Sequence, residues 1–416
     1  MENNGYYPLR AIQRWLINSH FNRAKSTMMN IRVCFKLPPE FDLNRLAQCI
    51  NESLQSYDMA RCRFVINPET NELCQRFDGE ISYVFVEKVS DEEFEQRKKY
   101  FTVPFEIMNK PLYRMYIFET PTAKYFYGDG YHAILDGMAW QMLFWREVDM
   151  RYKGKKITRT PLKYSDYILE EEKILQGDLS EGYNFFYEML KNFDPQKHLP
   201  PVDVAENVPS LEQETVTLNL QNINEEFFHG KKHTEHIFFL AASMLTLAKI
   251  SGAKSLVMSW LHNGRYNAQE RRLVGVMIEQ FPISWNFEKD LTVAEFLDGL
   301  AEKINLSFNY HHSLGKIYES GLQDDCATFI FQKKIYSLSV AGKEFEPVEL
   351  PQNEFAAVEN SLDIEVNLTE DKNYYLFLDC DASRYSAAAM KNFAKTFNEI
   401  VLKLQDENIL ISDILS

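Results

Sequence analysis

Hydrophobic residues recur with two different periods in the first half of the chain, and these periods predict strands and helices. Residues 29–37 alternate between apolar and polar side chains, as in a half-buried strand. Leu46, Ile50 and Leu54 recur every four residues, and Asp42 stands before them as a candidate N-cap. Strands and amphipathic helices are therefore expected side by side in this half.

A predicted hairpin leads directly into the segment GYHAILDG. Residues 111–119 and 124–133 flank the short turn TPTA and have the pattern of paired strands. An amphipathic run follows and reaches about Gly154, with Asp136 as the candidate N-cap of its helix. A histidine, a carboxylate and a glycine therefore meet at the joint between a strand and a helix.

The pattern begins again after a polar stretch that contains several prolines, from about residue 155 to 215. A strand is predicted at 214–220. Residues 233–252 are apolar almost all round, which predicts a buried helix, and residues 386–405 predict a final amphipathic helix. Both halves mix strands and helices without a repeat visible in the sequence, so we expect an α+β fold with mixed sheets.

Length and composition indicate two lobes with large apolar cores. The chain has 416 residues, of which 45% are hydrophobic, and this is more than one core usually holds. We place an N-terminal lobe at residues 1–175, which carries the YHAILDG motif, and a C-terminal lobe at 176–416, which carries the NGR segment. The net charge of −15 argues against a nucleic-acid surface, but it leaves room for a local basic patch that docks an acidic partner.

The cysteines and the N-terminal segment predict a soluble cytoplasmic protein. The six cysteines form no CxxC pair, which favours free or buried thiols in a reducing compartment. The first residues, MENNGYYPLR, lack the apolar core of a signal peptide. The longest apolar run, IFFLAASMLTLA, is shorter than the ~20 residues that span a bilayer, so no membrane contact is expected.

The residue types in GYHAILDG suit the handling of an acyl group. A strand that ends at His132 fixes the imidazole, and a helix that starts near Asp136 directs free N–H groups towards the same place. Gly137 has no side chain to block those amides. The imidazole can steer a proton while the amides hold an oxyanion. Two other interpretations stay open, namely a packed histidine and an aspartate that only caps the helix.

Three histidines in HGKKHTEH form the other cluster of candidate ligands. His229, His233 and His236 lie in a lysine-rich segment without a carboxylate or cysteine at a metal-ligand spacing. A solvated loop with Thr234 as the cap of the next helix is favoured over a zinc site. We therefore expect no metal.

Several segments resemble the condensation domains of nonribosomal peptide synthetases, a superfamily that includes chloramphenicol acetyltransferase. YHAILDG resembles the family's HHxxxDG motif, and YPLRAIQRWL resembles its opening PLTxxQ segment. HNGRYNAQERRLVGVMIEQFPISW is similar to the family's GRxxxxxxxxVGxFVNTLPLR stretch. Further similar segments are SYDMARCRF, VPFEIMNKPLYRMYIF, PLKYSDYILEEEK and LDIEVNLTEDKNYYLFLDCD. The resemblance covers nearly the whole chain in the right order.

This resemblance implies two chloramphenicol-acetyltransferase-like lobes in a V-shaped pseudo-dimer with a central tunnel. His132 matches the family's catalytic second histidine, and Gly137 matches the glycine whose N–H lies near the oxyanion. Asp136 matches a structural aspartate that pairs with an arginine, and Arg265 is the candidate partner. Tyr131 stands where the family usually has its first histidine and is expected to brace the loop.

The resemblance also implies a condensation-type acyltransferase of nonribosomal peptide biosynthesis. The donor would be an acyl or aminoacyl thioester on the phosphopantetheine arm of a carrier protein, and the acceptor an amine or a hydroxyl, free or carrier-bound. No cofactor would be bound, and the protein would be a monomer, either free-standing or a domain of a larger synthetase. Two alternatives remain: a catalytically silent domain that recruits a partner, and an acyl-coenzyme A-dependent acyltransferase for small molecules.

Overall fold

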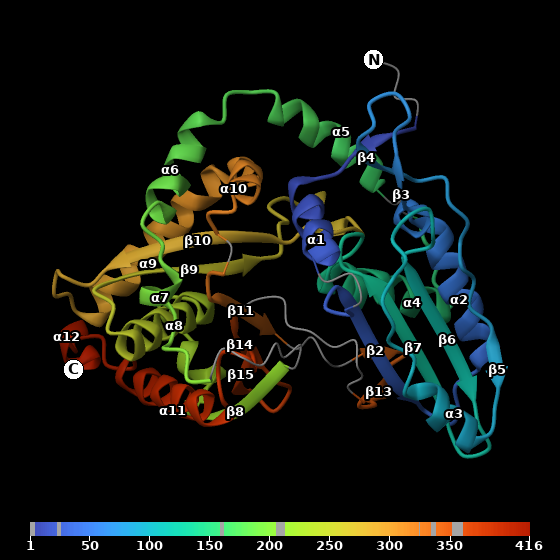
Figure 1. The fold of residues 1–416 in the computed structure, drawn as a ribbon. Coiled ribbons are helices and arrows are strands. Elements are labelled where there is room, and N and C mark those ends of the chain that lie inside the picture. The colour runs from blue at the N-terminus through green and yellow to red at the C-terminus, as the bar shows by residue number, and fades with distance from the viewer. Residues whose placement is uncertain are drawn as a thin grey trace. The chain divides into compact units, whose positions relative to one another are not determined.

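The structure is a computed structural model in which the chain forms two compact units (Figure 1). It describes residues 5–22, 26–158, 162–204, 213–323, 325–333, 338–351 and 361–416. The first unit holds residues 1–177, 263–278 and 335–356, and the second holds residues 178–262, 279–334 and 357–416.

The two units are not the two consecutive lobes that the sequence suggested. The first change of unit, between residues 177 and 178, falls close to the predicted boundary at 175/176. However, residues 263–278, which contain Arg265, belong to the first unit rather than to a C-terminal lobe. The physical reason is that this segment forms buried hydrogen bonds with the motif of the first unit, as described below.

The first unit is built on a six-stranded sheet of order β12-β13-β2-β7-β6-β5 and a small sheet of order β1-β4-β3. Its strands are β1 (Tyr7–Pro8), β2 (Asn30–Leu37), β3 (Arg63–Ile66), β4 (Leu73–Arg76), β5 (Val86–Lys88), β6 (Tyr113–Glu119), β7 (Lys124–Tyr131), β12 (Leu338–Val340) and β13 (Lys343–Pro347). Its helices and helical turns are α1 (Ala11–Asn22), α2 (Leu43–Ser56), η1 (Asp58–Arg61), α3 (Asp91–Lys98), η2 (Met138–Phe144), α4 (Trp145–Tyr152), α5 (Tyr164–Leu175) and η4 (Glu270–Arg272).

The alternation along β7 directs its side chains into two different layers. Tyr125 stacks on Phe94 of α3 with the ring centroids 3.9 Å apart. The next residue, Phe126, meets Trp145 of α4 edge-on at 4.8 Å. Successive residues of a strand point to opposite faces, so β7 has α3 on one face and α4 on the other.

Two glycines of β7 let the following loop and helix pack directly against the strand. A Cβ atom on Gly128 would lie 2.6 Å from Cζ2 of Trp140, and one on Gly130 would lie 3.1 Å from the methyl groups of Leu135. Real Cβ atoms do not approach other atoms as closely as 2.6 Å. The missing side chains therefore fix how closely the motif loop can sit on the sheet.

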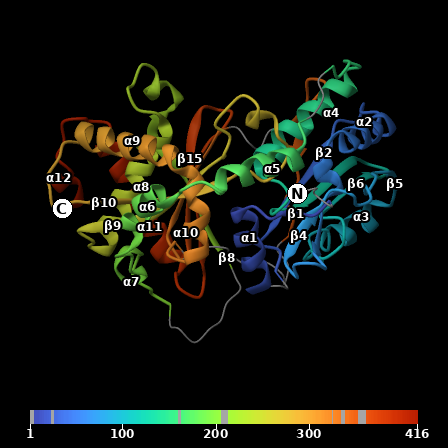
Figure 2. The same cartoon turned by 90° about the horizontal axis from the view of Figure 1, so that it is seen from above.

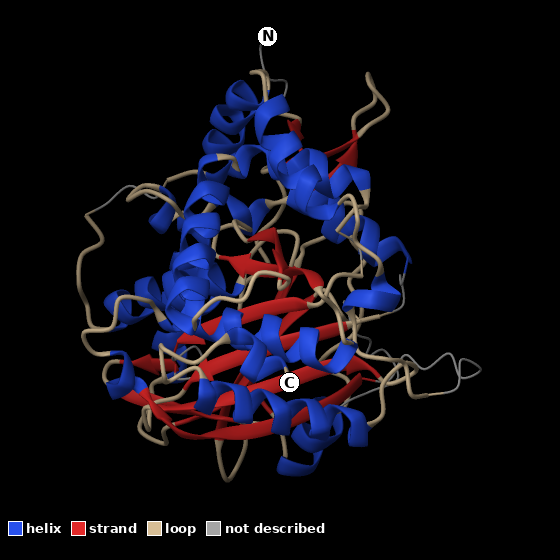
Figure 3. Ribbon diagram, turned by 90° about the vertical axis from the view of Figure 1, so that its left-hand side faces the viewer, coloured by secondary structure: helices blue, strands red, loops and turns tan. Residues whose placement is uncertain are grey.

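The second unit has a six-stranded sheet of order β10-β9-β11-β14-β15-β8, with helices packed over it (Figure 3). Its strands are β8 (Gln213–Asn224), β9 (Ser255–His262), β10 (Glu279–Asn286), β11 (Thr328–Lys333), β14 (Leu362–Leu368) and β15 (Asn373–Asp381). Its helices and helical turns are α6 (Ser180–Leu190), α7 (Pro195–His198), η3 (Glu225–Phe228), α8 (Glu235–Ser251), α9 (Val293–Asn309), η5 (His311–Ser313), α10 (Leu314–Ser320), α11 (Ala387–Lys403) and α12 (Ile411–Leu415).

The same strand–turn–helix arrangement occurs in both units. The neighbours β2-β7-β6-β5 correspond to β8-β15-β14-β11, with two antiparallel pairings followed by a parallel one in each set. Asp136 caps the helix after β7 and Ser386 caps the helix after β15, each accepting from the N–H three residues ahead. At the position of His132, the second copy has Ala382. The sequence alone did not reveal this repeat.

Most predicted elements are confirmed, and the α+β class with mixed sheets is among them. The hairpin β6–β7, the buried helix α8 with its Thr234 cap, and the final helix α11 lie where the pattern placed them. The polar stretch from 155 to 215 is not only a connection, because it contains α5 and α6.

All six cysteines are buried and unbridged. Among the described residues, no helix combines the length and apolar character needed to cross a membrane.

The first turn of α5 is capped by a residue that lies far away in the sequence. The carboxylate of Asp58 accepts hydrogen bonds from the backbone N–H groups of Tyr164 at 3.0 Å and Ser165 at 2.9 Å. These groups have no partner within their own helix. The start of α5 is thereby held beside η1, and β1 lies next to α5 as well (Figure 2).

We expect Asp58→Ala to lower the free energy of unfolding by about 1–2 kcal/mol, because two helix N–H groups lose their acceptor. Urea denaturation followed by circular dichroism would measure this change. Glu170→Ala serves as the control, since the exposed Glu170–Lys173 pair should contribute less than about 0.5 kcal/mol. Equal stabilities for the two variants would contradict the capping role.

Candidate functional site

Backbone hydrogen bonds hold the loop that follows β7 in a tight turn. The N–H of Tyr131 donates to the carbonyl of Leu112 at 2.8 Å, and that of His132 donates to the carbonyl of Met29 at 2.8 Å. The N–H of Ile134 then closes the turn on the carbonyl of Tyr131 at 3.0 Å. The backbone that carries the imidazole of His132 is therefore held in place by hydrogen bonds to two neighbouring segments.

His132 is half-buried and its imidazole is favoured in the neutral form. Burial lowers the pKa of His132 from its ordinary value of 6.5, because a charged ring loses hydration there. The backbone of His132 and Leu135 and the charge of Asp136 act in the opposite direction but do not reverse the shift. At neutral pH the ring can therefore accept a proton.

Asp136 and Arg265 form a fully buried ion pair, as the sequence analysis expected from the resemblance. Nη1 of Arg265 lies 2.9 Å from Oδ2 of Asp136, and Nη2 lies 3.2 Å from Oδ1, with both side chains wholly inaccessible. Oδ1 also accepts from the N–H of Ala139 at 2.8 Å, and Oδ2 accepts from the N–H of Met277 at 2.7 Å. The carboxylate thus caps the helix and also binds residues 263–278.

Arg265 directs its remaining hydrogen bonds to backbone carbonyls of its own segment. Its guanidinium donates to the carbonyls of Asn263, Leu273 and Gly275 at 2.9, 3.2 and 3.2 Å. Gly264 has a φ of +61°, and a Cβ there would lie 1.6 Å from the carbonyl oxygen of Met277. The glycine of the NGR segment is therefore needed for the segment to fold back on itself.

A pair of buried glutamines, Gln13 and Gln75, also supports the motif loop. Nε2 of Gln13 donates to the carbonyl of Ala133 at 2.8 Å and lies 3.0 Å from Oε1 of Gln75. Gln75 donates in turn to the carbonyl of Pro8 at 2.8 Å. The sequence analysis assigned no role to this pair, although Gln13 belongs to a segment that resembles the family. A glutamine among the helically spaced apolar residues Ile12, Trp15 and Leu16 was the available signal.

Gly137 leaves open space at the start of the helix. Apart from its two chain neighbours and the nearby backbone of its own helix, no atom lies within 4 Å of the position that a Cβ would take. Its N–H makes no hydrogen bond with the described residues. The helix begins with the π-helical turn η2, and such turns are frequent at functional sites. An oxyanion could approach this N–H without displacing a side chain.

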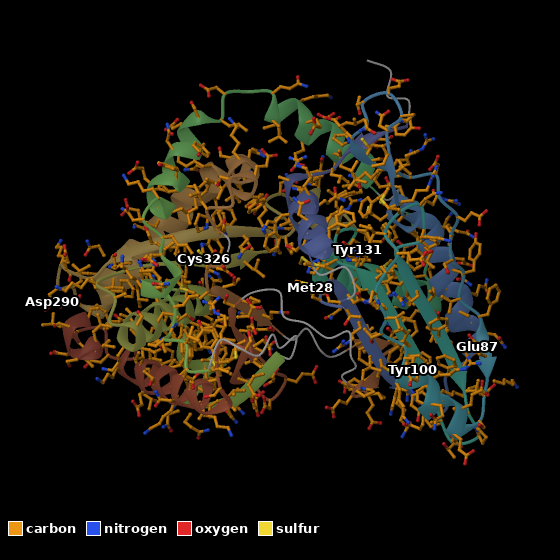
Figure 4. All side chains as sticks on the ribbon, viewed as in Figure 1. Met28, Glu87, Tyr100, Tyr131, Asp290 and Cys326 are labelled. Atoms are coloured by element: carbon orange, nitrogen blue, oxygen red, sulfur yellow. The ribbon has the colours of Figure 1, made fainter. Side chains whose placement is uncertain are left out.

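Tyr131 is a buried support for the loop rather than an exposed group. The side chain is fully buried at the end of β7, beside α1 (Figure 4). Its ring meets His20, Phe64 and Phe105 with centroids 5.4, 6.3 and 5.9 Å apart. Tyr131 is thus packed among other rings, while its bracing role and the direction of the His132 ring relative to Tyr131 stay predictions.

The structure brings the five predicted site residues together in the first unit. Tyr131, His132, Asp136 and Gly137 lie on one loop, and the ion pair adds Arg265. The sequence analysis placed Arg265 in a C-terminal lobe, so that this ion pair would have joined the motif to that lobe, and that part was wrong. The interaction lies within the first unit because residues 263–278 fold onto it.

The histidines of the lysine-rich segment have other neighbours. His233 lies 2.8 Å from Asp298, and His236 packs against Trp260 and Phe329. In the part of the chain that the structure describes, no group of three or more His, Cys, Asp or Glu residues is placed to hold a metal ion.

An apolar cavity of about 240 Å³ lies in the first unit. It is bordered by β2, by the segment around β13 and by the helix formed by η2 and α4, which is called the motif helix because it follows YHAILDG. Gln141 and Trp145 of the motif helix form part of its wall. Val33 and Phe35 of β2 and Pro347 of β13 form other parts. The same helix that begins at Gly137 thus borders a space suited to an apolar group.

We expect Asp136→Ala to lower the free energy of unfolding by about 3–5 kcal/mol, because it leaves the guanidinium of Arg265 buried without a counter-charge. Chemical denaturation would measure the loss. Glu95→Ala, which removes an exposed carboxylate paired with the partly buried Lys98, should cost under about 1 kcal/mol.

The double variant Asp136→Ala/Arg265→Ala tests the coupling directly. It should be less destabilised than the sum of the two single variants, because the two side chains share one interaction. Additive losses would show that the two residues stabilise the loop independently.

The comparisons with known proteins all indicate the same family. The family model described as "Condensation domain" matches residues 3–408. Surfactin synthase subunit 2 of Bacillus subtilis (strain 168) is 24% identical over 314 residues, which is 73% of this chain and 9% of that protein. The chain therefore spans about a tenth of the length of this curated relative.

Two solved structures share the fold. The condensation domain of the monacolin K polyketide synthase MokA has a TM-score of 0.81 and 16% identity, covering 98% of this chain and 99% of that one. The X-domain from teicoplanin biosynthesis, solved in complex with OxyB, has a TM-score of 0.79 and 15% identity, covering 100% and 96%. At such identities the likeness concerns the fold, whereas the family model covers nearly the whole sequence. The chain belongs to the condensation-domain family.

Proposed function

We propose that this protein is a condensation-type acyltransferase that joins an acyl or aminoacyl thioester to an amine acceptor. The observation that carries the proposal is the half-buried His132, whose pKa is lowered by burial, on the same loop as the open Gly137 N–H. Membership of the condensation-domain family supports the reaction class. The relatives are synthases of nonribosomal peptides in which this chain matches only a small part.

The proposed reaction needs one proton transfer and no redox step. The amine nitrogen attacks the thioester carbonyl, and the carbonyl oxygen becomes an oxyanion near the Gly137 N–H. The neutral imidazole of His132 positions the amine or accepts its proton. The carbon–sulfur bond then breaks, an amide is formed, and the thiolate leaves and takes up a proton.

The proposed donor is the phosphopantetheine arm of a carrier protein, and no bound cofactor is needed for this chemistry. The acceptor is a small molecule or a second carrier-bound group, with an amine favoured over a hydroxyl because it is the better nucleophile. A V-shaped pair of lobes with a central tunnel, a monomeric state and a cytoplasmic location are also part of this proposal.

A second candidate function is recruitment of a partner enzyme without catalysis. Two observations favour it, namely Tyr131 in the place of the family's first histidine and the likeness to an X-domain solved in complex with OxyB. A single-turnover assay separates the two functions. It uses an acyl thioester of a phosphopantetheinylated carrier, an amine acceptor and detection of the amide by mass spectrometry, and absence of amide with every donor would favour recruitment.

The first prediction concerns the protonation of His132. His132→Ala should reduce turnover by a factor on the order of a hundred or more. In the wild type, kcat/KM should stay high as the pH falls through 6.5 and decline only below it, since burial lowers the pKa and the neutral ring is the active form. An acid limb centred at or above 6.5 would contradict this assignment.

The second prediction concerns Tyr131. Tyr131→Phe keeps the ring contacts and should reduce turnover by less than about tenfold, or about 1.4 kcal/mol. Tyr131→His, which restores the usual residue, should also be nearly neutral. Tyr131→Ala should cost about 3–5 kcal/mol of stability by opening a cavity among the rings. Loss of all turnover in folded Tyr131→Phe would instead make the hydroxyl a reactant.

A further inference from the structure

Arg10 is a buried charged residue that has no part in the reaction described above. It lies directly before α1, and its side chain is only 4% exposed. Its guanidinium forms a bidentate ion pair with Glu171 of α5, in which Nε lies 2.7 Å from one carboxylate oxygen and Nη2 lies 2.6 Å from the other. The guanidinium also lies over the ring of Tyr167, 5.1 Å from its centroid. Bidentate pairing fixes the plane of the guanidinium, so its remaining nitrogen points in a defined direction.

That remaining nitrogen holds the peptide group that binds the motif. Nη1 of Arg10 donates to the carbonyl of Val276 at 2.7 Å, and the hydroxyl of Tyr164 donates to the same oxygen at 2.7 Å. The N–H of the same peptide group belongs to Met277 and donates to Oδ2 of Asp136 at 2.7 Å. Because a peptide group is planar and rigid, the position of Arg10 on one side determines where the N–H meets Asp136 on the other.

The same peptide group also transmits an effect of charge. A cation that donates to a carbonyl polarises the peptide and makes its N–H a stronger donor. The guanidinium of Arg10 therefore strengthens the hydrogen bond from Met277 to the carboxylate of Asp136. Arg265 compensates the charge of this carboxylate directly, and Arg10 adds to the compensation through the peptide.

The backbone of Arg10 supports the motif loop by a second route. Its N–H donates to Oε1 of Gln13 at 2.9 Å. Nε2 of Gln13 donates in turn to the carbonyl of Ala133, the residue after His132, at 2.8 Å. Arg10 therefore connects to both ends of the loop, because its backbone acts through the glutamine on the residue after His132 and its side chain acts through the peptide group on Asp136.

The side-chain link is a property of this chain rather than of the motif that it resembles. The motif PLTxxQ has a threonine at the position of Arg10. A threonine has neither the charge nor the length of an arginine, so it could not form the bidentate pair with Glu171.

We propose that Arg10 is a positioning residue of the candidate site, which fixes the motif loop through the peptide group of Val276 and Met277 and thereby places the imidazole of His132 for acyl transfer. This inference rests on the proposed function and adds a residue that acts through others rather than on the substrate. Its physical basis is that a displacement of about 1 Å in a reacting group can reduce turnover by roughly a hundredfold.

The first test compares two substitutions of Arg10 in steady-state amide formation from an acyl thioester. Arg10→Gln removes the charge and should lower kcat roughly tenfold or more with little change in KM, because the loop carries the reacting imidazole. Arg10→Lys keeps a cation that can donate to the carbonyl of Val276, and it should recover most of the loss. A rise of KM alone, or a lysine variant as slow as the glutamine variant, would contradict the positioning role.

Titration of the His132 ring by NMR gives a second readout that needs no turnover. Burial lowers the pKa of His132, and the charge of Asp136 acts in the opposite direction. Arg265 and the N–H of Met277 compensate that charge. Loss of the Arg10 cation weakens the compensation, so the pKa of His132 in Arg10→Gln should rise towards its ordinary value of 6.5. The His132 signal is identified by its absence in His132→Ala.

Ser90→Ala is the matched control for a loss of stability without a change at the motif. The hydroxyl of Ser90 caps α3 in the same unit by accepting from the N–H of Glu93 at 3.1 Å, and none of the hydrogen bonds described for Arg10 involves that helix. This variant should be less stable than the wild type but should keep the wild-type kcat and the wild-type titration of His132. Equal changes in Ser90→Ala and Arg10→Gln would show a purely structural role and overturn the inference.

Tyr164→Phe provides the test if Arg10→Gln does not fold. It removes only the second donor to the carbonyl of Val276, and it should raise the pKa of His132 in the same direction by a smaller amount. An unchanged titration in folded Arg10→Gln, or in Tyr164→Phe where it replaces that variant, would overturn the inference whatever the activity. If the wild type forms no amide with any donor, the proposed function fails, and the titration still decides whether Arg10 acts on the motif loop.

Discussion

The buried ion pair between Asp136 and Arg265 is the interaction on which the candidate site depends. It joins the loop after β7, the first turn of its helix and the separate segment 263–278 in one hydrogen-bonded group. Two buried charges are costly to desolvate, and the cost is offset here because both carboxylate oxygens and most guanidinium N–H groups have partners. Removal of either side chain would leave the other charge buried, so the arrangement specifies one position for the motif.

The ion pair also determines what His132 can do. Because Asp136 is occupied by Arg265, Ala139 and Met277, its charge is largely compensated and does not hold the imidazole in the protonated form. Burial then decides the outcome and lowers the pKa of His132. A carboxylate four residues from a histidine could be taken for its catalytic partner, but here it serves the structure of the loop.

The internal repeat shows that the strand–turn–helix arrangement does not by itself require a catalytic residue. Both units contain a hairpin, a tight turn and a capped helix in the same order, yet the second copy has Ala382 where the first has His132. Ser386 caps the helix of the second copy and binds the carboxylate of Asp203, whereas Asp136 binds an arginine. The strand–turn–helix joint is therefore a structural unit, and only the copy in the first unit combines it with His132, the Asp136–Arg265 ion pair and Gly137.

The sequence by itself determined the elements that depend on neighbouring residues. The apolar repeat of α2 with its Asp42 cap, the β6–β7 hairpin, and α8 between Thr234 and Gly252 are all set by interactions a few residues apart. The resemblance to a family added the candidate residues and named Arg265 as the partner of Asp136, which spacing alone could not do because 129 residues separate them.

Only the tertiary structure decided which distant segments share a unit. Residues 263–278 join the first unit, Asp58 caps a helix that begins at Tyr164, and Arg271 and Arg272 come to line one groove with Arg146. Each of these brings together residues that lie far apart in the chain. Local hydrophobic periodicity carries no information about such contacts, because it reports which face of an element is buried and not which element covers it.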